Sequence, residues 1–325
     1  MNILVTGGAG YIGSHACKAL AAEGHTPIAY DNLSRGNRWA VKWGPLEEGN
    51  VADTRRVSEV LEKYKPEALM HFAAYAYVGE SVEQPSLYYD NNFCGTAALL
   101  RTLVAFQSLP VVFSSTCATY GVPNRIPISE DHPQNPINPY GRSKMFVEQL
   151  LRDLNCAHGL PWVAMRYFNA AGADADGDIG ESHHPETHLI PLAITAAQKG
   201  KTLRIYGSDY DTPDGTCVRD YVHVSDIADA HVRALKYLFS GGESSVFNLA
   251  NARGYSVKEV VATTERVCGK AINVELSPRR PGDPAILIGE ARRARAVLGW
   301  NPSRSELETQ IRDGRNWMEK HDVVR

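Results

Sequence analysis

Short apolar runs alternate with longer amphipathic segments through the first half of the chain. Runs such as ILV and VVF, which show little alternation of polar and apolar positions, are typical of strands buried on both faces. The segments between them carry apolar residues three to four positions apart, which predicts helices. This βαβ rhythm predicts an α/β fold with a doubly wound parallel sheet. The predicted strands are Asn2 to Thr6, Thr26 to Tyr30, Ala68 to His71 and Val111 to Ser114, and the predicted helices are Ile12 to Glu23, Thr54 to Tyr64 and Asn92 to Phe106.

From about residue 170 the composition of the chain changes, and Gly, Asp, His and Pro become frequent. The stretches 170–191, 209–215 and 278–284 are too long to be simple connectors. We expect one domain over residues 1–170, extended by sheet elements near residues 221–250, and a smaller C-terminal lobe formed mainly by residues 171–325. Further helices are predicted at Ile190 to Lys199, Ser225 to Phe239, Ser256 to Cys268 and Glu306 to Lys320.

Composition narrows the class of protein. The 325 residues are 43% hydrophobic and 22% charged, which is enough to bury a large core. A net charge of -3 with scattered Lys and Arg argues against a nucleic-acid partner. Six cysteines lie far apart without a CxxC pair, which is typical of reduced thiols in the cytoplasm. No charged leader precedes the first strand and no apolar run is long enough for a membrane span, so we expect neither secretion nor membrane insertion.

A glycine-rich turn joins the first predicted strand to the first predicted helix. Its sequence TGGAGYIG, from Thr6 to Gly13, contains both GxGxxG and GxxGxxG spacings. Glycines at such a turn let the backbone approach phosphate oxygens at the N-terminus of a helix. The turn therefore predicts a Rossmann-type sheet that binds the pyrophosphate of a dinucleotide through Gly7, Gly10 and Gly13.

Asp31 selects between the two nicotinamide cofactors. It ends the second predicted strand, where a carboxylate can accept hydrogen bonds from ribose hydroxyls and repels the extra phosphate of NADP. Arg35 and Arg38 are candidate ligands for that phosphate, but an arginine after a strand is more often solvated. NAD is therefore the predicted cofactor.

Tyr140 and Lys144 are the candidate catalytic pair. They lie four residues apart in NPYGRSK, so on a helix their head groups share one face. Lowering a phenol pKa from about 10 to neutrality requires about 4 kcal/mol, for which the Lys144 ammonium and the nicotinamide ring are candidate sources. Thr116, with Ser114 and Ser115, stands at the carboxyl end of the fourth or fifth strand, where it can share a substrate hydroxyl with Tyr140. The alternative is that these hydroxyls satisfy backbone groups at a strand end.

Ordered motifs along nearly the whole chain resemble the extended short-chain dehydrogenase/reductases, and among these the UDP-glucose 4-epimerases. The general motifs are TGGAGYIG, YDN, HFAA, VGES, YYDNN, FSSTCATYG and NPYGRSK. The narrower resemblance lies in RYFNAAGA, ETHLIP, DGTCVRDYVHV and RRPGD.

The resemblance implies interconversion of UDP-glucose and UDP-galactose through a 4-keto intermediate, with transient hydride transfer to bound NAD+. It implies that Tyr140 is base and then acid, that Lys144 tunes it, and that Thr116 positions the hydroxyl. It also implies a homodimer. The predicted cofactor-binding residues are Gly7, Gly10, Tyr11, Ile12, Gly13, Asp31, Asn32, Asn50, Val51, Phe72, Ala73, Ala74, Asn91, Ser114, Tyr140, Lys144 and Tyr167. The predicted UDP-sugar-binding residues are Thr116, Asn169, His188, Leu189, Tyr206, Arg219, Arg280 and Asp283.

Guanidinium forks suit a diphosphate, so Arg219 and Arg280 are the expected phosphate ligands. The alternative is that they form ion pairs with Asp220 and Asp283. No metal is expected, because no acidic or Cys residue is seen at ligand spacing from His183, His184 and His188.

Three positions depart from the pattern of the family. Asn50 stands where an Asp often faces the adenine, and Ala76 stands where many members have a Lys. Leu287 fills a place where some members carry a Tyr that excludes N-acetylated sugars, which favours room for UDP-N-acetylglucosamine.

Other functions stay open. The substrate can be another UDP-sugar, such as UDP-xylose and UDP-arabinose or UDP-GlcNAc and UDP-GalNAc. A nucleotide-sugar dehydratase is disfavoured, because Cys117 and Ala118 follow Thr116 where such enzymes usually carry an Asp-Glu pair. A dehydrogenase of free sugars or sterols has no evident need of two phosphate-binding arginines. A non-catalytic nucleotide sensor is disfavoured by the intact Tyr140 and Lys144.

Overall fold

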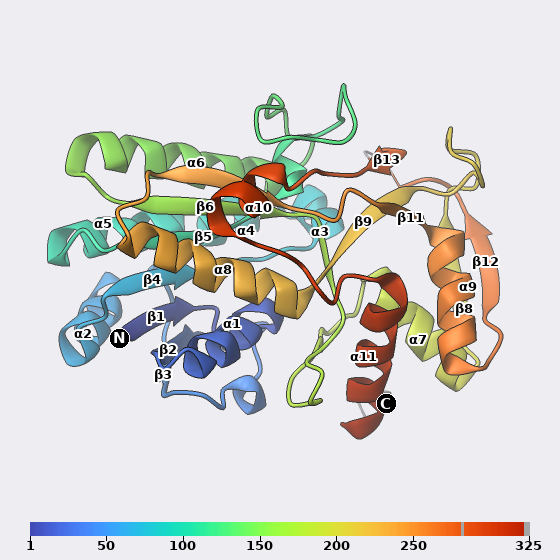
Figure 1. The fold of residues 1–325 in the computed structure, drawn as a ribbon, viewed down its shortest axis with the longest axis horizontal. Helices are drawn as coiled ribbons and strands as arrows, with labels where there is room; N and C mark the ends of the chain where they lie inside the picture. Colours follow the sequence, from blue (N-terminus) through green and yellow to red (C-terminus); the bar gives the residue numbers. More distant parts are fainter. Residues whose placement is uncertain (281–282, 322–325) are drawn as a thin grey trace.

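A computed structural model describes residues 1–280 and 283–321 of the chain. Its main feature is a sheet of seven parallel strands in the order β10-β6-β5-β4-β1-β2-β3 (Figure 1). This confirms the predicted α/β fold with a doubly wound parallel sheet. The strands are β1 (Asn2–Thr6), β2 (Thr26–Asp31), β3 (Leu46–Glu48), β4 (Ala68–His71), β5 (Val111–Thr116), β6 (Trp162–Tyr167) and β10 (Ser245–Leu249).

Helices cover both faces of this sheet, as the uninterrupted apolar strands require. One hydrophobic core joins the sheet to α1, α8 and α10, and a second joins its other face to α2, α5 and α6 (Figure 1). The helices are α1 (Tyr11–Ala22), α8 (Val224–Phe239), α10 (Arg292–Leu298), α2 (Thr54–Tyr64), α5 (Thr96–Phe106) and α6 (Pro139–His158). Short helices α3 (Val78–Glu83) and α4 (Pro85–Tyr88) lie between β4 and α5.

The remaining elements form a smaller lobe beside the carboxyl ends of the main strands (Figure 1). In this lobe β9 pairs with β7, β11 and β13, and β8 pairs with β12. The loops between these elements are the long Gly- and Pro-rich stretches of the sequence. The lobe elements are β7 (Asn169–Ala171), α7 (Leu189–Lys199), β8 (Thr202–Tyr206), β9 (Val218–His223), β11 (Gly254–Ser256), α9 (Val257–Cys268), β12 (Asn273–Ser277), β13 (Ile286–Leu287) and α11 (Leu307–Lys320). None of the described helices has the length and apolar character that crossing a membrane requires.

The order in which the chain adds strands to the sheet reverses between β1 and β4. From β1 the chain moves outward to β2 and β3, then returns to β4 on the other side of β1 and continues to β5 and β6. Open parallel sheets bind ligands in the crevice at such a point. The glycine turn lies here: Gly7 has φ +72°, and a Cβ on Gly13 would lie 2.1 Å from the Gly7 carbonyl oxygen. Only glycine fits this close approach of α1 to β1.

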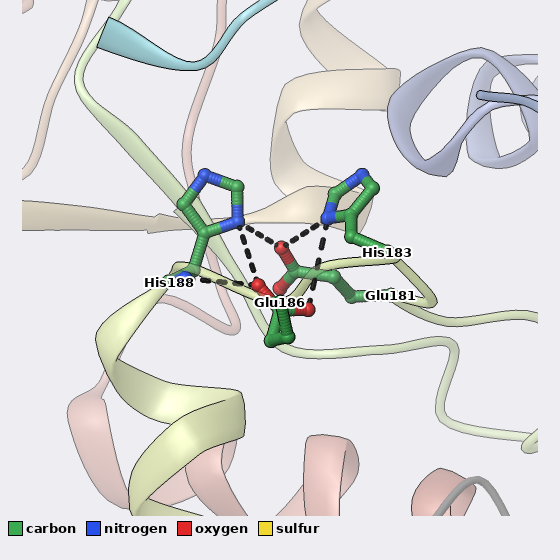
Figure 2. Close-up of side chains that lie close together, drawn as sticks. All are labelled: Glu181, His183, Glu186 and His188. Carbon is green, nitrogen blue, oxygen red and sulfur yellow. Dashed lines mark hydrogen bonds and ion pairs between the residues drawn. The ribbon is translucent and has the colours of Figure 1, made fainter. Parts of the chain in front are cut away.

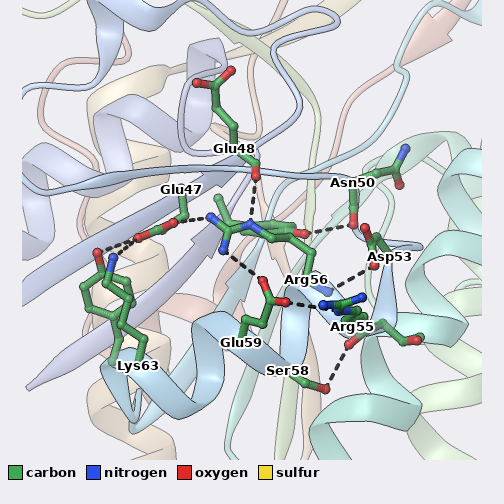
Figure 3. Close-up of polar contacts among 12 residues, drawn as sticks. Glu47, Glu48, Asn50, Asp53, Arg55, Arg56, Ser58, Glu59 and Lys63 are labelled. Carbon is green, nitrogen blue, oxygen red and sulfur yellow. Dashed lines mark hydrogen bonds and ion pairs between the residues drawn. The ribbon is translucent and has the colours of Figure 1, made fainter.

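A buried carboxylate anchors α2 to β3 (Figure 3). Glu47 accepts hydrogen bonds from Lys63 at 2.7 Å and from the Tyr64 hydroxyl at 2.6 Å, and it pairs with Arg56. Burial raises the pKa of Glu47, but these three donors outweigh burial and lower it to about 2. The network therefore fixes the outer edge of the sheet next to the crevice.

Candidate active site

A single cavity of about 1360 Å³ extends from the crevice of the main sheet into the lobe. This exceeds the range of about 300–1,000 Å³ that is usual for one drug-sized ligand, so it has room for two nucleotides. Every predicted site residue except Asn50 lines it. Asn50 is exposed, and its amide oxygen accepts a hydrogen bond from the backbone N–H of Ala52 (Figure 3 shows its position). The expected contact of Asn50 with an adenine is therefore not supported by the lining of the cavity.

Asp31 lies buried at the end of β2. Its carboxylate accepts hydrogen bonds from the N–H groups of Leu33 at 2.8 Å and Ala9 at 3.1 Å. A carboxylate offers about four acceptor sites, so two remain for other donors. Burial raises the pKa of Asp31, and the two backbone donors act against this.

Arg35 and Arg38 are both engaged in ion pairs. Arg35 pairs with Glu80 at 2.6 Å and lies over the rings of Tyr75 and Tyr77, while Arg38 pairs with Glu48. The sequence suggested solvated arginines, and this is wrong for Arg35, which spans from the end of β2 to α3. Arg35 thereby connects the two walls of the crevice.

Tyr140 and Lys144 lie in the first two turns of α6, as their spacing predicted. Pro139 begins this helix, and Asn138 caps it by accepting a hydrogen bond from the Gly141 N–H at 2.8 Å. Lys144 Nζ donates to the Ser114 carbonyl oxygen at 2.9 Å, at the end of β5. Both side chains are buried and line the cavity.

Burial sets the protonation of this pair. It raises the pKa of Tyr140, to which Tyr167 adds, while the Thr116 hydroxyl acts in the opposite direction. Burial also lowers the pKa of Lys144 to about 7. The sequence predicted that the Lys144 ammonium helps to lower the pKa of Tyr140. In the chain without cofactor this lowering does not occur, and the phenol stays protonated.

Thr116 and Ser114 stand at the end of β5, the fifth strand along the chain. The Thr116 hydroxyl accepts a hydrogen bond from the Ala118 N–H at 3.1 Å. It therefore satisfies a backbone group at the strand end, the alternative considered from the sequence. Its own proton remains available for a substrate oxygen. The Ser114 hydroxyl lies 2.5 Å from that of Tyr167, so it connects the strand end to the cavity wall.

The lobe contributes cationic and aromatic groups to the other half of the cavity. Arg219 is buried and pairs with Asp283, which is the ion pair weighed as an alternative, and it makes none with Asp220. The Arg280 guanidinium lies 4.1 Å from the ring centre of Tyr206. Both guanidinium groups still line the cavity, where Asp283 balances the charge of Arg219.

The amide of Asn169 and the start of α7 also line the cavity. Asn169 donates to the Asp220 carbonyl oxygen at 2.9 Å. His188 precedes α7 and Leu189 begins it. The RRPGD motif includes residues 281–282, which lie outside the described residues.

Comparison with known proteins identifies the family. Residues 3–250 match the NAD dependent epimerase/dehydratase family. The chain belongs to this family. The UDP-glucose 4-epimerase of Rhizobium meliloti (strain 1021) is 53% identical over 317 residues, 97% of this chain and 96% of that protein. A crystal structure of UDP-glucose 4-epimerase from Brucella ovis in complex with NAD matches with a TM-score of 0.94 and 51% identity over 97% of each chain. One from Bifidobacterium longum in complex with NAD+ and UDP has a TM-score of 0.95 and 35% identity over 100% of each chain.

The described residues fit the cofactor of this NAD-dependent family. A Cβ on Gly7 or Gly13 would lie within 2.6 Å of backbone atoms, so the turn stays open to a phosphate only with glycine there, and α1 begins within it at Tyr11. Asp31 keeps two acceptor sites for ribose hydroxyls at the end of β2. The NAD prediction is confirmed.

We expect Asp31→Ala to weaken NAD binding about 10- to 100-fold, because it removes a buried acceptor of charge-assisted hydrogen bonds. Equilibrium titration of cofactor-stripped protein with NAD and with NADP measures this. The preference for NAD over NADP should shrink, since the repelling carboxylate is gone. Glu62→Ala, which removes a carboxylate from the exposed face of α2, is the control. Unchanged NAD affinity in Asp31→Ala would contradict the role of Asp31.

From the sequence, no acidic residue was expected at ligand spacing from the histidines of the lobe, and this is wrong. Glu181 and Glu186 do lie at ligand spacing from His183 and His188, with ligand atoms within 4.8 Å of one another (Figure 2). Burial lowers the pKa of His183, but its contacts with Glu181 and Glu186 more than offset this and raise it to about 9. These histidines are therefore not solvated, although His184 is exposed.

The site also depends on a residue that sequence reasoning missed. A π-helical turn at Tyr89–Gly95 precedes α5 and directs Asn92 inward. The Asn92 amide pairs with both backbone groups of Tyr75, at 2.8 and 2.9 Å, and donates to Ser143 at 3.1 Å. It therefore ties the Tyr75 loop to α6, one residue before Lys144. The sequence predicted a regular helix beginning at Asn92. Its apolar periodicity gave no signal for a π-helical turn.

Proposed function

We propose that this protein interconverts UDP-glucose and UDP-galactose by inverting C4 of the sugar. The observation that carries the proposal is one cavity that joins the dinucleotide cradle and the Tyr140–Lys144 pair to the cationic wall formed by Arg219 and Arg280. NAD+, when bound, supplies a reversible acceptor for the hydrogen of C4. The arginines of the lobe match the diphosphate of a UDP-sugar.

Tyr140 removes the proton of the sugar 4-hydroxyl and later returns it. Burial holds this phenol protonated in the chain alone, so the phenolate forms only when positive charge is close by. The pKa of Lys144 near 7 lets this lysine gain a proton at little cost as the phenolate develops. Thr116 donates to the same oxygen and aligns it with Tyr140. A 4-keto sugar is the product of this first half of the reaction.

Dehydration of the sugar is not supported by the side chains that follow Thr116. That reaction requires an acid and a base at C5 and C6. Here Cys117 and Ala118 occupy the next two positions, and burial raises the pKa of Cys117 to about 12. A thiol in that state does not act as a base near neutral pH.

The proposal is tested by incubating the purified protein with UDP-glucose and no added cofactor. Chromatographic separation of the C4 epimers should show UDP-galactose, while the absorbance of the nicotinamide shows no net change. Accumulation of reduced cofactor in proportion to sugar consumed indicates a dehydrogenase. Absence of any C4 epimer with retained NAD would contradict UDP-glucose as substrate, and the same result with the other UDP-sugars indicates a nucleotide sensor.

The leucine at position 287 favours a second substrate. Leu287 of β13 lines the cavity and packs against the cluster that contains Phe168. We expect the protein also to epimerise UDP-N-acetylglucosamine, and Leu287→Tyr to lower that turnover about 10-fold or more. Turnover of UDP-glucose should stay within about threefold. No epimer of UDP-N-acetylglucosamine with the unmodified protein would remove this second substrate.

The same proposal includes a homodimer in the cytoplasm. Helices α5 and α6 pack side by side and leave Phe106 and Phe146 40% and 39% exposed. The rings of Tyr89 and Phe93 lie against Phe146, while Phe106 lies at the other end of α5. A two-fold axis through the two helices would cover both exposed phenylalanines. Six free cysteines agree with a reducing compartment.

A further inference from the structure

Two histidines and two glutamates converge on one point in the wall of the cavity (Figure 2). All four come from the loop that leads into α7, within eight residues of chain. The Glu181 side chain is 6% exposed, that of His183 18% and that of Glu186 20%, while His188 is 45% exposed. The cluster is thus shielded on the side of the protein and open on the side of the cavity.

The separations of the ligand atoms suit a small divalent cation. Bonds of about 2.0–2.2 Å in a tetrahedral site place neighbouring ligand atoms about 3.4 Å apart. His183 Nδ1 lies 3.1 Å from Glu181 Oε1 and 3.7 Å from Glu186 Oε2, and His188 Nδ1 lies 3.3 Å from Glu186 Oε1. His188 Nδ1 and Glu181 Oε1, 2.5 Å apart, have to separate further.

A second observation concerns the imidazole of His183. Its Nδ1 atom is buried and faces both carboxylates, yet within the described chain it has no hydrogen-bond partner. It lies at ion-pair distance from both carboxylates without a well-aligned hydrogen bond to either, so it keeps its capacity to bind another group. Zinc binds the lone pair that Nδ1 exposes when the imidazole gives up its proton, so binding releases that proton.

The charge of the cluster also fits. Burial lowers the pKa of both histidines, but Glu181 and Glu186 outweigh it and raise the pKa of His183 to about 9 and that of His188 to about 10. The metal-free cluster of two carboxylates and two imidazolium groups is therefore neutral. One divalent cation that displaces the two imidazolium protons leaves this charge unchanged. Throughout the part of the chain that the structure describes, neither glutamate forms an ion pair with a lysine or arginine. By contrast, the neighbouring acidic group of Asp174, Asp176 and Asp178 already holds a cation, because Lys18 Nζ lies 2.7–3.1 Å from all three.

We propose that Glu181, His183, Glu186 and His188 bind one zinc ion. The site goes beyond the proposed epimerase reaction and takes no part in its chemistry. Its place in the fold indicates its role: Leu189 directly follows His188, and the Tyr77 hydroxyl donates to the Pro185 carbonyl oxygen at 3.2 Å inside the same loop. Zinc would therefore fix the wall of the cavity where the lobe meets the Tyr77 loop of the main domain.

The test uses the untagged NAD-bound protein, freed of metal with a chelator that is then removed. Titration with zinc against a chromophoric competitor gives stoichiometry and affinity, and cobalt in place of zinc reports the ligand geometry by its visible spectrum. We expect one ion per chain and a tetrahedral cobalt spectrum. Binding should weaken at least 10-fold in His183→Ala and in Glu186→Gln.

His184→Ala is the matched control, because His184 is an exposed histidine in the same loop that lies outside the cluster. It should bind zinc like the unmodified protein. Glu186→Gln keeps the size of the side chain, so its far-ultraviolet circular dichroism and its NAD content should be unchanged. No stoichiometric binding, equal binding by His183→Ala, or loss of binding in His184→Ala would each overturn the proposal.

Discussion

Replacing Tyr140 with Phe is expected to lower kcat for epimerisation of UDP-glucose by about 10³-fold while the bound NAD is retained. The change removes the one hydroxyl that takes and returns the proton, an effect of about 10²–10⁴-fold for general acid–base catalysis. It removes no apolar volume from the buried site, so the fold should tolerate it. Coupled assay of UDP-galactose formation gives the rate, and absorbance of the released cofactor after denaturation gives the NAD content.

Tyr237→Phe is the matched control, because the Tyr237 hydroxyl donates only to the Glu243 carbonyl oxygen far from the cavity. It should keep the activity of the unmodified protein. Near-normal turnover in Tyr140→Phe would refute Tyr140 as the base. Loss of NAD together with activity would show that the residue holds the cofactor.

Replacing Arg166 with Met is expected to lower the free energy of unfolding by about 3–5 kcal/mol. Arg166 of β6 donates to Glu148 of α6 through Nε at 2.9 Å and through a second nitrogen, and both side chains are buried. Glu148 also accepts from the Ser115 hydroxyl at 2.5 Å, next to Thr116. The substitution leaves a buried carboxylate whose remaining ion pair, with the partly exposed Arg152, is long at 3.8 Å. Chemical denaturation followed by circular dichroism, at equal NAD saturation, measures the loss.

The double variant Arg166→Met/Glu148→Leu distinguishes this cause from a simple packing defect. Removing both charges relieves the unpaired carboxylate, so the double variant should be more stable than Arg166→Met alone. A double variant that loses the sum of the two single effects would show that the ion pair is not the reason. Because α6 carries Tyr140 and Lys144, the unpaired variant should also lose activity.

The sequence predicted those features of the fold that depend on local pattern. The bounds of β1, α2 and β4 agree with the apolar periodicity, and α1 begins one residue earlier than predicted. The glycine turn, Asp31 and the Tyr140–Lys144 spacing are local too, and all of them line the cavity. Each of these signals is contained within a few consecutive residues.

Features that depend on tertiary contacts were missed. Within the π-helical turn at Tyr89–Gly95, Asn92 pairs with Tyr75, 17 residues away, and local periodicity does not report such a contact. Arg35 is engaged because Glu80 comes to it from α3. The Glu181–His188 cluster was overlooked because its ligand spacing fits neither a helix nor a strand. The repeated ExH pattern in ESHHPETH was a signal that a search for loop ligands can use.

The most direct test of the account follows one hydrogen atom. If C4 loses its hydrogen and regains it inside one cavity, UDP-glucose carrying deuterium at C4 should yield UDP-galactose that keeps the deuterium at C4. Mass spectrometry and proton resonance of the separated product measure this in ordinary water. Full retention is the result that the account predicts. Replacement of the deuterium by solvent hydrogen would contradict it.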